Sequence, residues 1–369
     1  MKAIRVVTII CWLIAAVALL GLAVWFLTGT VFGIHSDSWS TGDWIPRFSL
    51  GFNVGGWESL SGPYNEAGTY TVKTAGIDSI NIDWIASGVD VKPYDGADIK
   101  ITEYAQRELR EDEKAYINTS GGTLTVKFRE QGVSVRMPQK KLEVLVPGAL
   151  CENLNKFQVD SASGSVNVSG LGAKTFKTDA ISGSVNISDI TAGTFDVSTT
   201  SGSISVKHVG AEGIKLESIS GSIRLSDSSA GTVKCNTMSG SINTAGTFDS
   251  IGLGSISGSL TLDSLAAIAV LDAESSSGSL NLSGAFGTVK TESISGTTTI
   301  KSSIVPSSLK VETTSGGINI HIPDEGAITV KHSSVSGRFS SDVPITLQNS
   351  GAQFNIETIS GSARIYVLN

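Results

Sequence analysis

The sequence has little charge and few of the residues that build catalytic or metal sites. Charged residues make up 17% of its 369 residues, the net charge is −7, and there are four histidines and three cysteines. A nucleic-acid binder needs a surplus of Lys and Arg to meet the phosphate backbone, so this class is excluded. A chain of this length can bury a sizeable core, which excludes a small disulfide-stapled module, and disordered chains need more charge and fewer β-branched residues.

Proline is absent from one long stretch, because none occurs between Pro147 and Pro306. Proline cannot donate a backbone hydrogen bond to a neighbouring strand, so a proline-free region of this length is typical of continuous β-sheet. Glycine, in contrast, is abundant at 41 residues, against a usual share of roughly 7% of a chain.

The amino terminus carries a long apolar run, Val6–Leu27, with Lys2 and Arg5 before it. As a helix this run would be about 33 Å long, enough to cross the hydrocarbon core. By the positive-inside rule the short tail stays in the cytoplasm and the remainder is extracytoplasmic. We therefore predict a single-pass cell-membrane protein with a cytoplasmic tail (1–5) and a transmembrane signal anchor (6–28).

Residues 29–75 are rich in glycine and aromatic residues, and all six tryptophans of the chain lie at or before Trp84. Trp39 and Trp44 follow the apolar run closely enough to lie at the lipid headgroups, where indole is favoured. We interpret 29–75 as a juxtamembrane linker, with a cap on the first turn of the following fold as the alternative.

A Ser-Gly pair recurs through the rest of the chain, first at steps of 19 residues and then at steps of 18 to 24. Near-constant spacing in a region rich in Val, Ile and Thr, without a helical pattern, indicates stacked coils of one chain. The repeat glycines are Gly164, Gly183, Gly202, Gly221, Gly240, Gly258, Gly278, Gly296, Gly316, Gly337 and Gly361.

Aligning the copies on this glycine reveals columns. The position seven residues before it is always apolar, and positions two and four after it are mostly apolar, so these columns face inward. Lys dominates six residues before it and an acid four residues before it, which predicts an outward face with diagonal Lys–acid pairs. We place a corner between five and two residues before the glycine, where the alternation breaks.

These columns predict an all-β fold, a single-chain parallel β-solenoid of 19–20-residue coils preceded by the transmembrane helix. The coils are regular over 161–369 and degenerate over 76–160. Within the degenerate part, Glu103–Tyr116 carries five acids and three bases, and we interpret it as a solvated loop or short helix. The final residues Arg364–Asn369 form a predicted strand without a cap.

Three segments and the repeat train together resemble a known family. They are Ile77–Ile82, Tyr94–Ile101 and Leu142–Pro147, followed by the Ser-Gly-Ser-Ile copies. This order of parts resembles the bacterial β-strand-repeat family labelled "putative adhesin", a domain of unknown function, over about residues 76–369. The resemblance implies a bacterial envelope protein, often with one amino-terminal membrane helix and sometimes linked to envelope stress. It carries over no catalytic residues.

The chain offers no catalytic, cofactor-binding or metal-ligating residues that we can name. The histidines lack ligand spacing, and no serine copy has a base beside it. Cys235 lies in an inward column, and Cys151 is too distant along the rod for a disulfide. We therefore expect no enzyme, no cofactor and free buried thiols.

Three functions stay open. The first is a non-catalytic, membrane-anchored surface solenoid, adhesin-like, which binds a glycan, a cell-wall polymer or a partner protein through its hydroxyl-rich face. The second is an envelope scaffold that self-associates end to end through the uncapped strand at 364–369. The third, with the least support, is a polysaccharide-cleaving β-helix enzyme, which would need clustered carboxylates in a cleft.

Overall fold

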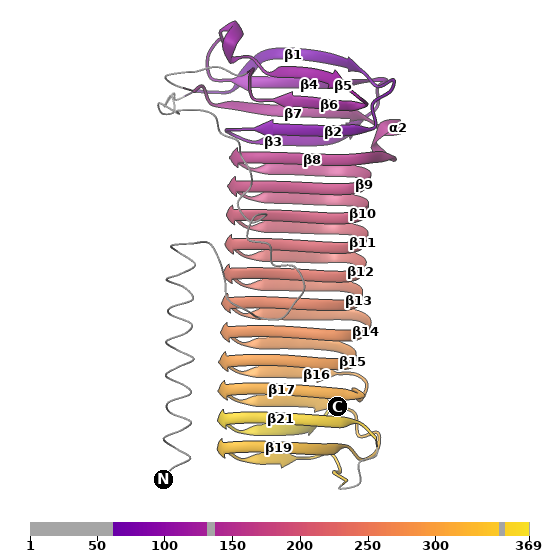
Figure 1. The fold of residues 1–369 in the computed structure, drawn as a ribbon, viewed down its shortest axis with the longest axis vertical. Coiled ribbons are helices and arrows are strands. Elements are labelled where there is room, and N and C mark those ends of the chain that lie inside the picture. The colour runs from indigo at the N-terminus through magenta and orange to yellow at the C-terminus, as the bar shows by residue number, and fades with distance from the viewer. Residues whose placement is uncertain (1–61, 131–136, 347–350, 369) are drawn as a thin grey trace. The chain divides into compact units, whose positions relative to one another are not determined.

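The computed structural model describes residues 62–130, 137–346 and 351–368, and within them the chain forms one continuous parallel β-solenoid (Figure 1). Successive coils pair in register at a step of 19 residues, so that Val185 aligns with Ile204. The predicted all-β parallel solenoid is therefore confirmed.

The long strands of the middle region each follow most of one coil, from two residues after one repeat glycine to the residue before the next. The strands are β1 (Asn65–Lys73), β2 (Ser79–Trp84), β3 (Val89–Tyr94), β4 (Asp98–Ala105), β5 (Tyr116–Ser120), β6 (Thr123–Lys127), β7 (Lys140–Pro147), β8 (Leu154–Ser163), β9 (Val166–Ser182), β10 (Val185–Ser201), β11 (Ile204–Ser220), β12 (Ile223–Ser239), β13 (Ile242–Ser257), β14 (Leu260–Ser277), β15 (Leu280–Ser295), β16 (Thr298–Ser302), β17 (Ser308–Ser315), β18 (Ile318–Ile322), β19 (Thr329–Ser336), β20 (Phe339–Ser341), β21 (Gln353–Ser360) and β22 (Ala363–Val367). Two short helical turns, η1 (Glu111–Glu113) and α2 (Gly148–Cys151), interrupt them.

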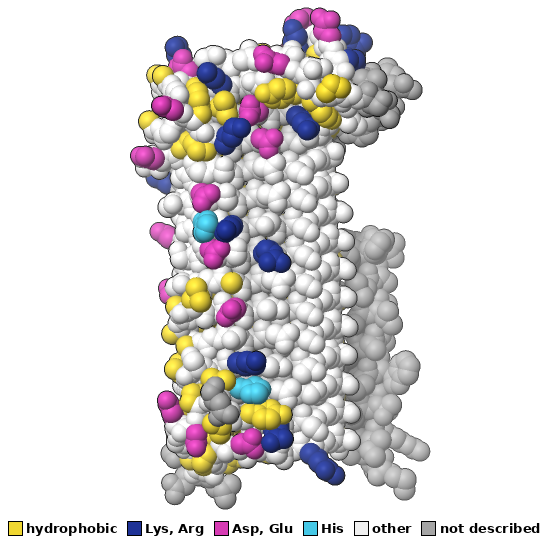
Figure 2. Space-filling model, turned by 180° about the vertical axis from the view of Figure 1, so that it is seen from behind, with side chains coloured by type: hydrophobic (Ala, Val, Ile, Leu, Met, Phe, Trp, Pro, Cys, Tyr) yellow, Lys and Arg dark blue, Asp and Glu magenta, His cyan; other side chains and the backbone are white. Residues whose placement is uncertain are grey.

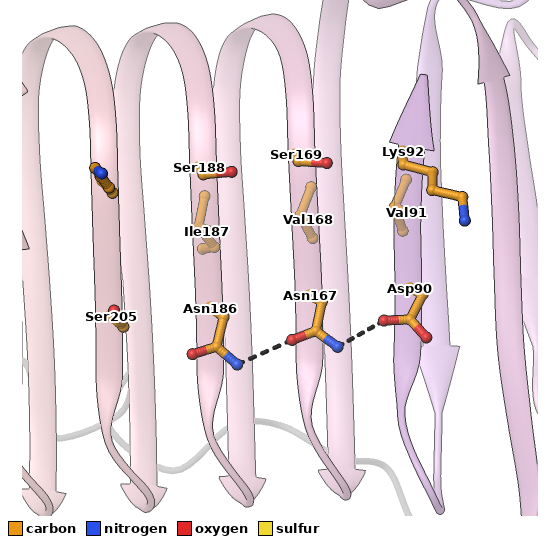
Figure 3. A pocket seen from close by; sticks show the side chains of 11 residues that line it. Asp90, Val91, Lys92, Asn167, Val168, Ser169, Asn186, Ile187, Ser188 and Ser205 are labelled. Atoms are coloured by element: carbon orange, nitrogen blue, oxygen red, sulfur yellow. Dashed lines mark hydrogen bonds between the residues drawn. The ribbon is translucent and has the colours of Figure 1, made fainter. Parts of the chain in front are cut away.

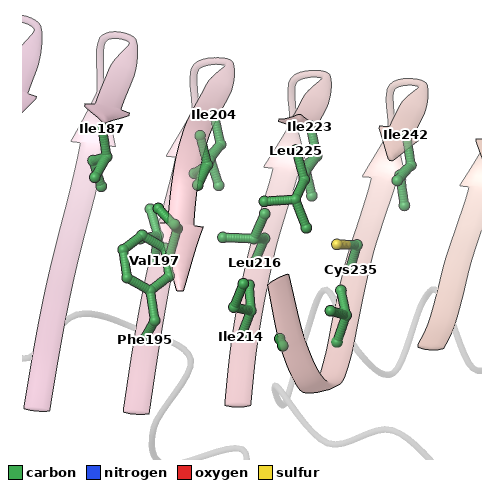
Figure 4. Close-up of a cluster of buried hydrophobic side chains, with 14 of the residues drawn as sticks. Ile187, Phe195, Val197, Ile204, Ile214, Leu216, Ile223, Leu225, Cys235 and Ile242 are labelled. Atoms are coloured by element: carbon green, nitrogen blue, oxygen red, sulfur yellow. The ribbon is translucent and has the colours of Figure 1, made fainter. Parts of the chain in front are cut away.

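The core is a set of stacked apolar ladders. In the column seven residues before the glycine, Phe157, Phe176 and Phe195 are buried, with ring centroids 5.1 and 4.8 Å apart. Figure 4 shows Phe195, Ile214 and neighbouring aliphatic side chains inside the coils. Burial of each such side chain stabilises the fold by about 1.5–3 kcal/mol, so the ladders supply most of the cohesion between coils.

The corner lies at the Ser-Gly-Ser sequence itself, later than predicted. Inward alternation continues to the third residue before the glycine, where a buried Ser or Thr takes the place of an apolar residue. In four coils this hydroxyl donates to the corner carbonyl of the preceding coil, as from Ser218 to Gly202 (3.3 Å) and from Thr237 to Gly221 (3.1 Å). In other coils, as at Thr199 and Thr313, it is buried without a hydrogen-bond partner. The hydrophobic pattern did not reveal this inward column because Ser and Thr are polar.

The corner requires glycine because the backbones of successive coils come too close for a side chain. A Cβ added to Gly202 would overlap the carbonyl oxygen of Gly183, and the same holds from coil to coil through the ladder. The ladder also contains Gly88, which lies directly against Gly164. Sequence reasoning missed this copy, although Ser87-Gly88 stands four steps of 19 residues before Gly164.

The coil that comes first in the chain is an inner coil. β2 pairs with β8 on one side and with β6 on the other, and β3 pairs with β9 and with β7. Along the solenoid axis the order is therefore β6–β7, then β2–β3, then β8–β9. Outside this coil, β4 lies antiparallel to β7, β1 antiparallel to β4, and β5 antiparallel to β6.

These antiparallel strands correct two predictions. Residues 76–160 are more than degenerate coils, because β4 and β5 reverse direction and close the N-terminal end. The predicted linker 29–75 contains β1, a strand of the same sheet. Single-strand patterns gave no sign of direction, since parallel and antiparallel edge strands show the same alternation.

At the C-terminal end, too, the order of the coils along the axis differs from their order in the chain. β21 pairs with β17 and β19, and β22 pairs with β18 and β20, so the last coil of the chain lies between the two coils before it (Figure 1). The prediction that Arg364–Asn369 leaves an uncapped strand is wrong, because β22 is an interior strand. Among the described residues the outer strands of this end are β19 and β20.

A buried ion pair holds the N-terminal end together. The side chains of Glu103 and Lys140 are fully buried, with Oε2 and Nζ 2.9 Å apart. Lys140 also donates to the backbone carbonyls of Glu113 (2.6 Å) and Phe128 (2.5 Å). Burial lowers the pKa of Lys140, and these three acceptors offset the cost of burying its charge.

The charged excursion Glu103–Tyr116 contains the short helix η1, one of the two predicted alternatives, but it is not fully solvated. Glu113 is buried and pairs with the guanidinium of Arg107 at 2.8 Å. The hydrogen bond from Arg107 lowers the pKa of the Glu113 carboxyl to about 2. Charge alone indicated solvent exposure, whereas Arg107 and Arg110 satisfy the carboxylate of Glu113 inside the fold and Lys140 satisfies that of Glu103.

In the part of the chain that the structure describes, no helix has the length and hydropathy of a membrane span. The predicted anchor at 6–28 and the aromatic residues Trp39 and Trp44 lie outside the described residues.

Candidate functional site

One wall of the solenoid carries two outward columns, three and five residues after each corner glycine. We call it the amide–hydroxyl face. It comprises Asn167, Ser169, Asn186, Ser188, Ser205, Lys207, Arg224, Ser226, Asn243, Ala245, Thr261, Asp263, Asn281, Ser283, Thr299, Lys301, Asn319, His321, Ser340, Asp342, Arg364 and Tyr366, with Asp90 and Lys92 in the coil of Gly88.

The N-terminal part of this face is hollowed, with a volume of about 540 Å³ (Figure 3). A ladder of hydrogen bonds runs along it from coil to coil. The amide of Asn186 donates to Asn167 (2.9 Å), and Asn167 donates to the Asp90 carboxylate (2.5 Å). Parallel coils place these amides at about 4.8 Å intervals, so the wall presents a regular row of donors and acceptors.

Cations flank this row. Lys92 pairs with Glu143 at 2.8 Å, and Lys207 lies 3.8 Å from Asp227. Both side chains are about half exposed, at 53% and 54%. The hollow therefore combines amides, hydroxyls and two accessible ammonium groups, a set that can hydrogen-bond to a polyhydroxylated ligand.

The opposite wall carries the Lys and acid columns that the sequence placed outward. Their ion pairs lie mainly within one coil, between residues two apart, instead of diagonally as predicted: Lys215–Glu217 at 2.7 Å and Lys310–Glu312 at 2.6 Å. Residues two apart on a strand share a face, which makes this the shorter contact. Glu217 is buried by its partner and neighbours, at 7% exposure.

Three carboxylates stack on this opposite wall, because Asp83, Asp160 and Asp179 are register partners in neighbouring coils. Burial raises the pKa of Asp160 to about 6, and Asp179 and Asp83 add to the effect. Sequence reasoning did not bring Asp83 to this column, since the chain order of the first coils was unknown. The hollow of the amide–hydroxyl face lies on the other side of the corner glycines, away from these acids.

The residues singled out from the sequence lie in the corners and in the core of the solenoid. The repeat glycines line the corner ladder. Cys151 and Cys235 are free and buried, as predicted, and burial raises the pKa of Cys151 to about 11. Within the described ranges no group of His, Cys, Asp and Glu has the arrangement of a metal site. His208 lies at a corner, 3.3 Å from Asp189, and His332 stacks on Phe339.

The fold and these columns can be compared with known proteins. The model of the family described as Toastrack DUF4097 matches residues 77–250 and 230–367. The chain belongs to this family. The resemblance to bacterial "putative adhesin" β-strand repeats is thereby confirmed.

Solved structures similar to this Toastrack chain include two described as "putative adhesin", from Parabacteroides distasonis and Bacteroides fragilis. They are 15% and 11% identical, with 83% of this chain and 98% of each structure covered and TM-scores of 0.40 and 0.33. A "putative lipid binding protein" from Parabacteroides distasonis is 12% identical, with coverage of 81% and 96% and a TM-score of 0.34. None of the three is described as an enzyme. No curated protein matches the chain.

Proposed function

We propose that this Toastrack solenoid is a non-catalytic binding protein of the bacterial envelope, which holds an extended glycan or cell-wall polymer along its amide–hydroxyl face. The observation that carries the proposal is the hydrogen-bonded row from Asn186 through Asn167 to Asp90 inside a hollow of about 540 Å³. Amides and hydroxyls repeated at the coil spacing suit a ligand that is itself a repeat of hydroxyl-bearing units.

The ladder favours binding because it fixes the amides before a ligand arrives. A side chain that is already ordered loses less conformational entropy on binding. Each coil adds a similar set of donors and acceptors, so weak contacts accumulate along the axis. Affinity then grows with the length of the polymer, whereas a single sugar unit binds weakly.

The test uses the full chain in detergent and isolated bacterial cell walls, with sedimentation as the measurement. Asn186→Trp places a bulky ring on the exposed row, and Thr194→Trp places the same ring at an exposed position of the same strand, β10, on the other wall. We expect the wild type and Thr194→Trp to co-sediment and Asn186→Trp to lose binding. Circular dichroism checks that both variants fold. Equal binding by the two variants would exclude this face, and no binding by the wild type would exclude the function.

We also propose that residues 6–28 anchor the chain in the cell membrane, with the solenoid on the extracytoplasmic side. The apolar run Val6–Leu27 behind Lys2 and Arg5 supports this topology. Protease added to intact protoplasts should degrade the solenoid and spare a cytoplasmic control protein. Protection of the solenoid until lysis would contradict the proposed side.

The two alternatives have less support. End-to-end assembly relied on an uncapped strand at 364–369, and β22 is covered on both sides. A polysaccharide-cleaving enzyme needs carboxylates in a cleft, and the stacked acids Asp83, Asp160 and Asp179 lie on the wall away from the hollow of the amide–hydroxyl face. Electron microscopy for filaments and an assay for released sugars on the sedimentation samples test each in turn.

A further inference from the structure

Near the C-terminal end, the amide–hydroxyl face changes its chemistry. Lys301, His321 and Tyr366 occupy the same position in three neighbouring coils, and Arg364 precedes Tyr366 by two residues on β22. All four side chains reach the surface. Figure 2 shows Lys and Arg, Asp and Glu, His and hydrophobic side chains gathered toward this end, beside coils with few charged side chains.

Three of these side chains, His321, Tyr366 and Arg364, order one another. The rings of His321 and Tyr366 stack with centroids 4.6 Å apart and an angle of 9° between their planes. The Arg364 guanidinium carbon lies 4.6 Å from the Tyr366 ring centroid, and Arg364 Nη2 lies 3.4 Å from Asp342. Stacking and cation–π contacts of this kind restrict rotamers, so the outer N–H and O–H groups form a preset row along the axis.

The charge of this row is incompletely balanced. In the described part of the chain Lys301 has no ion-pair partner, and the single pair of Arg364 is the half-exposed one with Asp342. Burial, together with the neighbouring Lys301, lowers the pKa of His321, so the imidazole is neutral at pH 7 and serves as a hydrogen-bonding group. An unpaired ammonium held beside such a stack attracts an anion.

Lys301 also lines a second hollow, of about 340 Å³, which contains Leu265 and Leu368. The ammonium group thus lies where a hollow lined by Leu, Ala and Ser residues meets the polar row. A ligand that lies along the face would meet this combination after the mixed amide, hydroxyl and charged groups of the middle coils.

We propose that Lys301, His321, Tyr366 and Arg364 form an anion subsite of the amide–hydroxyl face, which takes the carboxylate or phosphate groups of an acidic, polyhydroxylated polymer. This inference rests on the proposed function and specifies its ligand. The chain as a whole carries a net charge of −7, so an acidic polymer is repelled by most of the surface and is attracted at this end. Such an arrangement fixes the register of the ligand as well as its affinity.

The test measures binding of three soluble polymers to the full chain in neutral detergent: polygalacturonate for carboxylate, poly(glycerol phosphate) for phosphate, and dextran as the uncharged comparison. The variant is Lys301→Ala/Arg364→Ala. Its matched control, Lys290→Ala/Lys310→Ala, removes the same charge from the opposite wall. Tyr366→Phe keeps the ring stack and removes one hydroxyl donor.

We expect at least one acidic polymer to bind more tightly than dextran and to weaken as salt increases. The subsite variant should lose about tenfold or more in affinity, Tyr366→Phe a few-fold, and the matched control little. Preference for polygalacturonate or for poly(glycerol phosphate) identifies the anion, and either supports the proposal. Equal binding of dextran, or full acidic-polymer binding by the subsite variant, overturns it.

The failure of this subsite and the failure of the proposed function are distinguishable. If cell walls bind the wild type and Asn186→Trp prevents it, while the subsite variant binds every polymer as the wild type does, only the subsite is wrong. If neither cell walls nor any of the three polymers binds the wild type, both are wrong.

Discussion

The two ends of the solenoid share an unusual chain order but are closed differently. At both ends the outermost coil is not the terminal one in sequence, because β2–β3 and β21–β22 are each inserted between two other coils. The N-terminal end is then covered by antiparallel strands and the buried Glu103–Lys140 pair. The C-terminal end finishes at β19, whose residues are at most half-buried.

Insertion of the terminal coil protects the chain end in the same way at both ends of the solenoid. A solenoid whose terminal coil is outermost leaves that coil bonded on one side only, free to fray from the chain end. Insertion of the terminal coil gives it neighbours on both sides. The outermost coil, which has a free edge, is then connected to the rest of the chain at both of its ends. At the N-terminal end, the antiparallel strands also cover most of this free edge.

The largest expected effect comes from disturbing the inserted coil at the C-terminal end. Phe354 is buried between Leu309 and Val330 in the ladder. We expect Phe354→Ala to lower the free energy of unfolding by about 3–5 kcal/mol, measured by denaturant titration. Val330→Ala in the outer coil of the same ladder should cost about 1 kcal/mol or less, because Val330 is only half-buried. Equal costs would mean that the insertion gives no protection.

Removal of the buried charge pair tests the N-terminal closure. Glu103→Ala leaves the Lys140 ammonium buried without a carboxylate, which typically costs about 3–5 kcal/mol. The control Glu111→Ala removes a carboxylate of the same excursion. The Glu111 side chain is 90% exposed and pairs with Lys114, so its removal should change stability little. A small effect of Glu103→Ala in thermal unfolding would contradict a structural role for the pair.

The glycine ladder distinguishes inner coils from an outer coil. Gly202 lies in the middle of the stack, where an added Cβ would overlap the carbonyl oxygen of Gly183. Gly337 lies in the outer coil, where an added Cβ would overlap the carbonyl oxygen of Gly361 in the inserted coil. We expect Gly202→Ala to cost about 2–3 kcal/mol, because neighbours on both sides prevent a shift. Gly337→Ala should cost about 1 kcal/mol, since the outer coil can move away. The midpoints of chemical unfolding measure both, and the reverse order would argue against a rigid ladder.

The smallest effect concerns pH. Burial raises the pKa of Asp160 from 3.8 to about 6, so the folded state holds the proton more tightly than the unfolded state does. Stability contributed by the protonated carboxyl is therefore present below about pH 4 and is lost as the pH rises through about 6. Asp160→Asn should raise the free energy of unfolding by roughly 1–2 kcal/mol at pH 7 and by little at pH 4.

The matched control for this pH effect lies near the other end. Glu312 occupies the same column and pairs with Lys310 at 2.6 Å. Glu312→Gln removes a partnered carboxylate and should not stabilise the protein at either pH. Stabilisation by Glu312→Gln at pH 7 would show that the acid column as a whole, and not the stack at Asp160, is unfavourable.

Much of the solenoid can be predicted from the sequence because each repeat packs mainly against the repeats next to it. Inward columns such as that of Phe176 recur at the coil length, and each copy reports the same environment. The inward position of Ser218 was not predicted, because a polar side chain is expected outside. Inside the fold, its hydroxyl is satisfied by a carbonyl of the preceding coil. The proposed anion subsite was missed for a similar reason, because Arg364 and Tyr366 come beside the coil of His321 only when the last coil is inserted between β18 and β20.

The sequence by itself determined the parallel coils, their length and the inward ladders, because these depend on periodic side-chain properties of neighbouring copies. Only the tertiary structure decided the order of the coils at the two ends, the burial of Glu103 and Lys140, and the position of β22 inside the stack. Those features depend on pairing between segments that no local pattern distinguishes. Any strand with the right alternation fits beside any other, and the choice is made by which arrangement buries the ends.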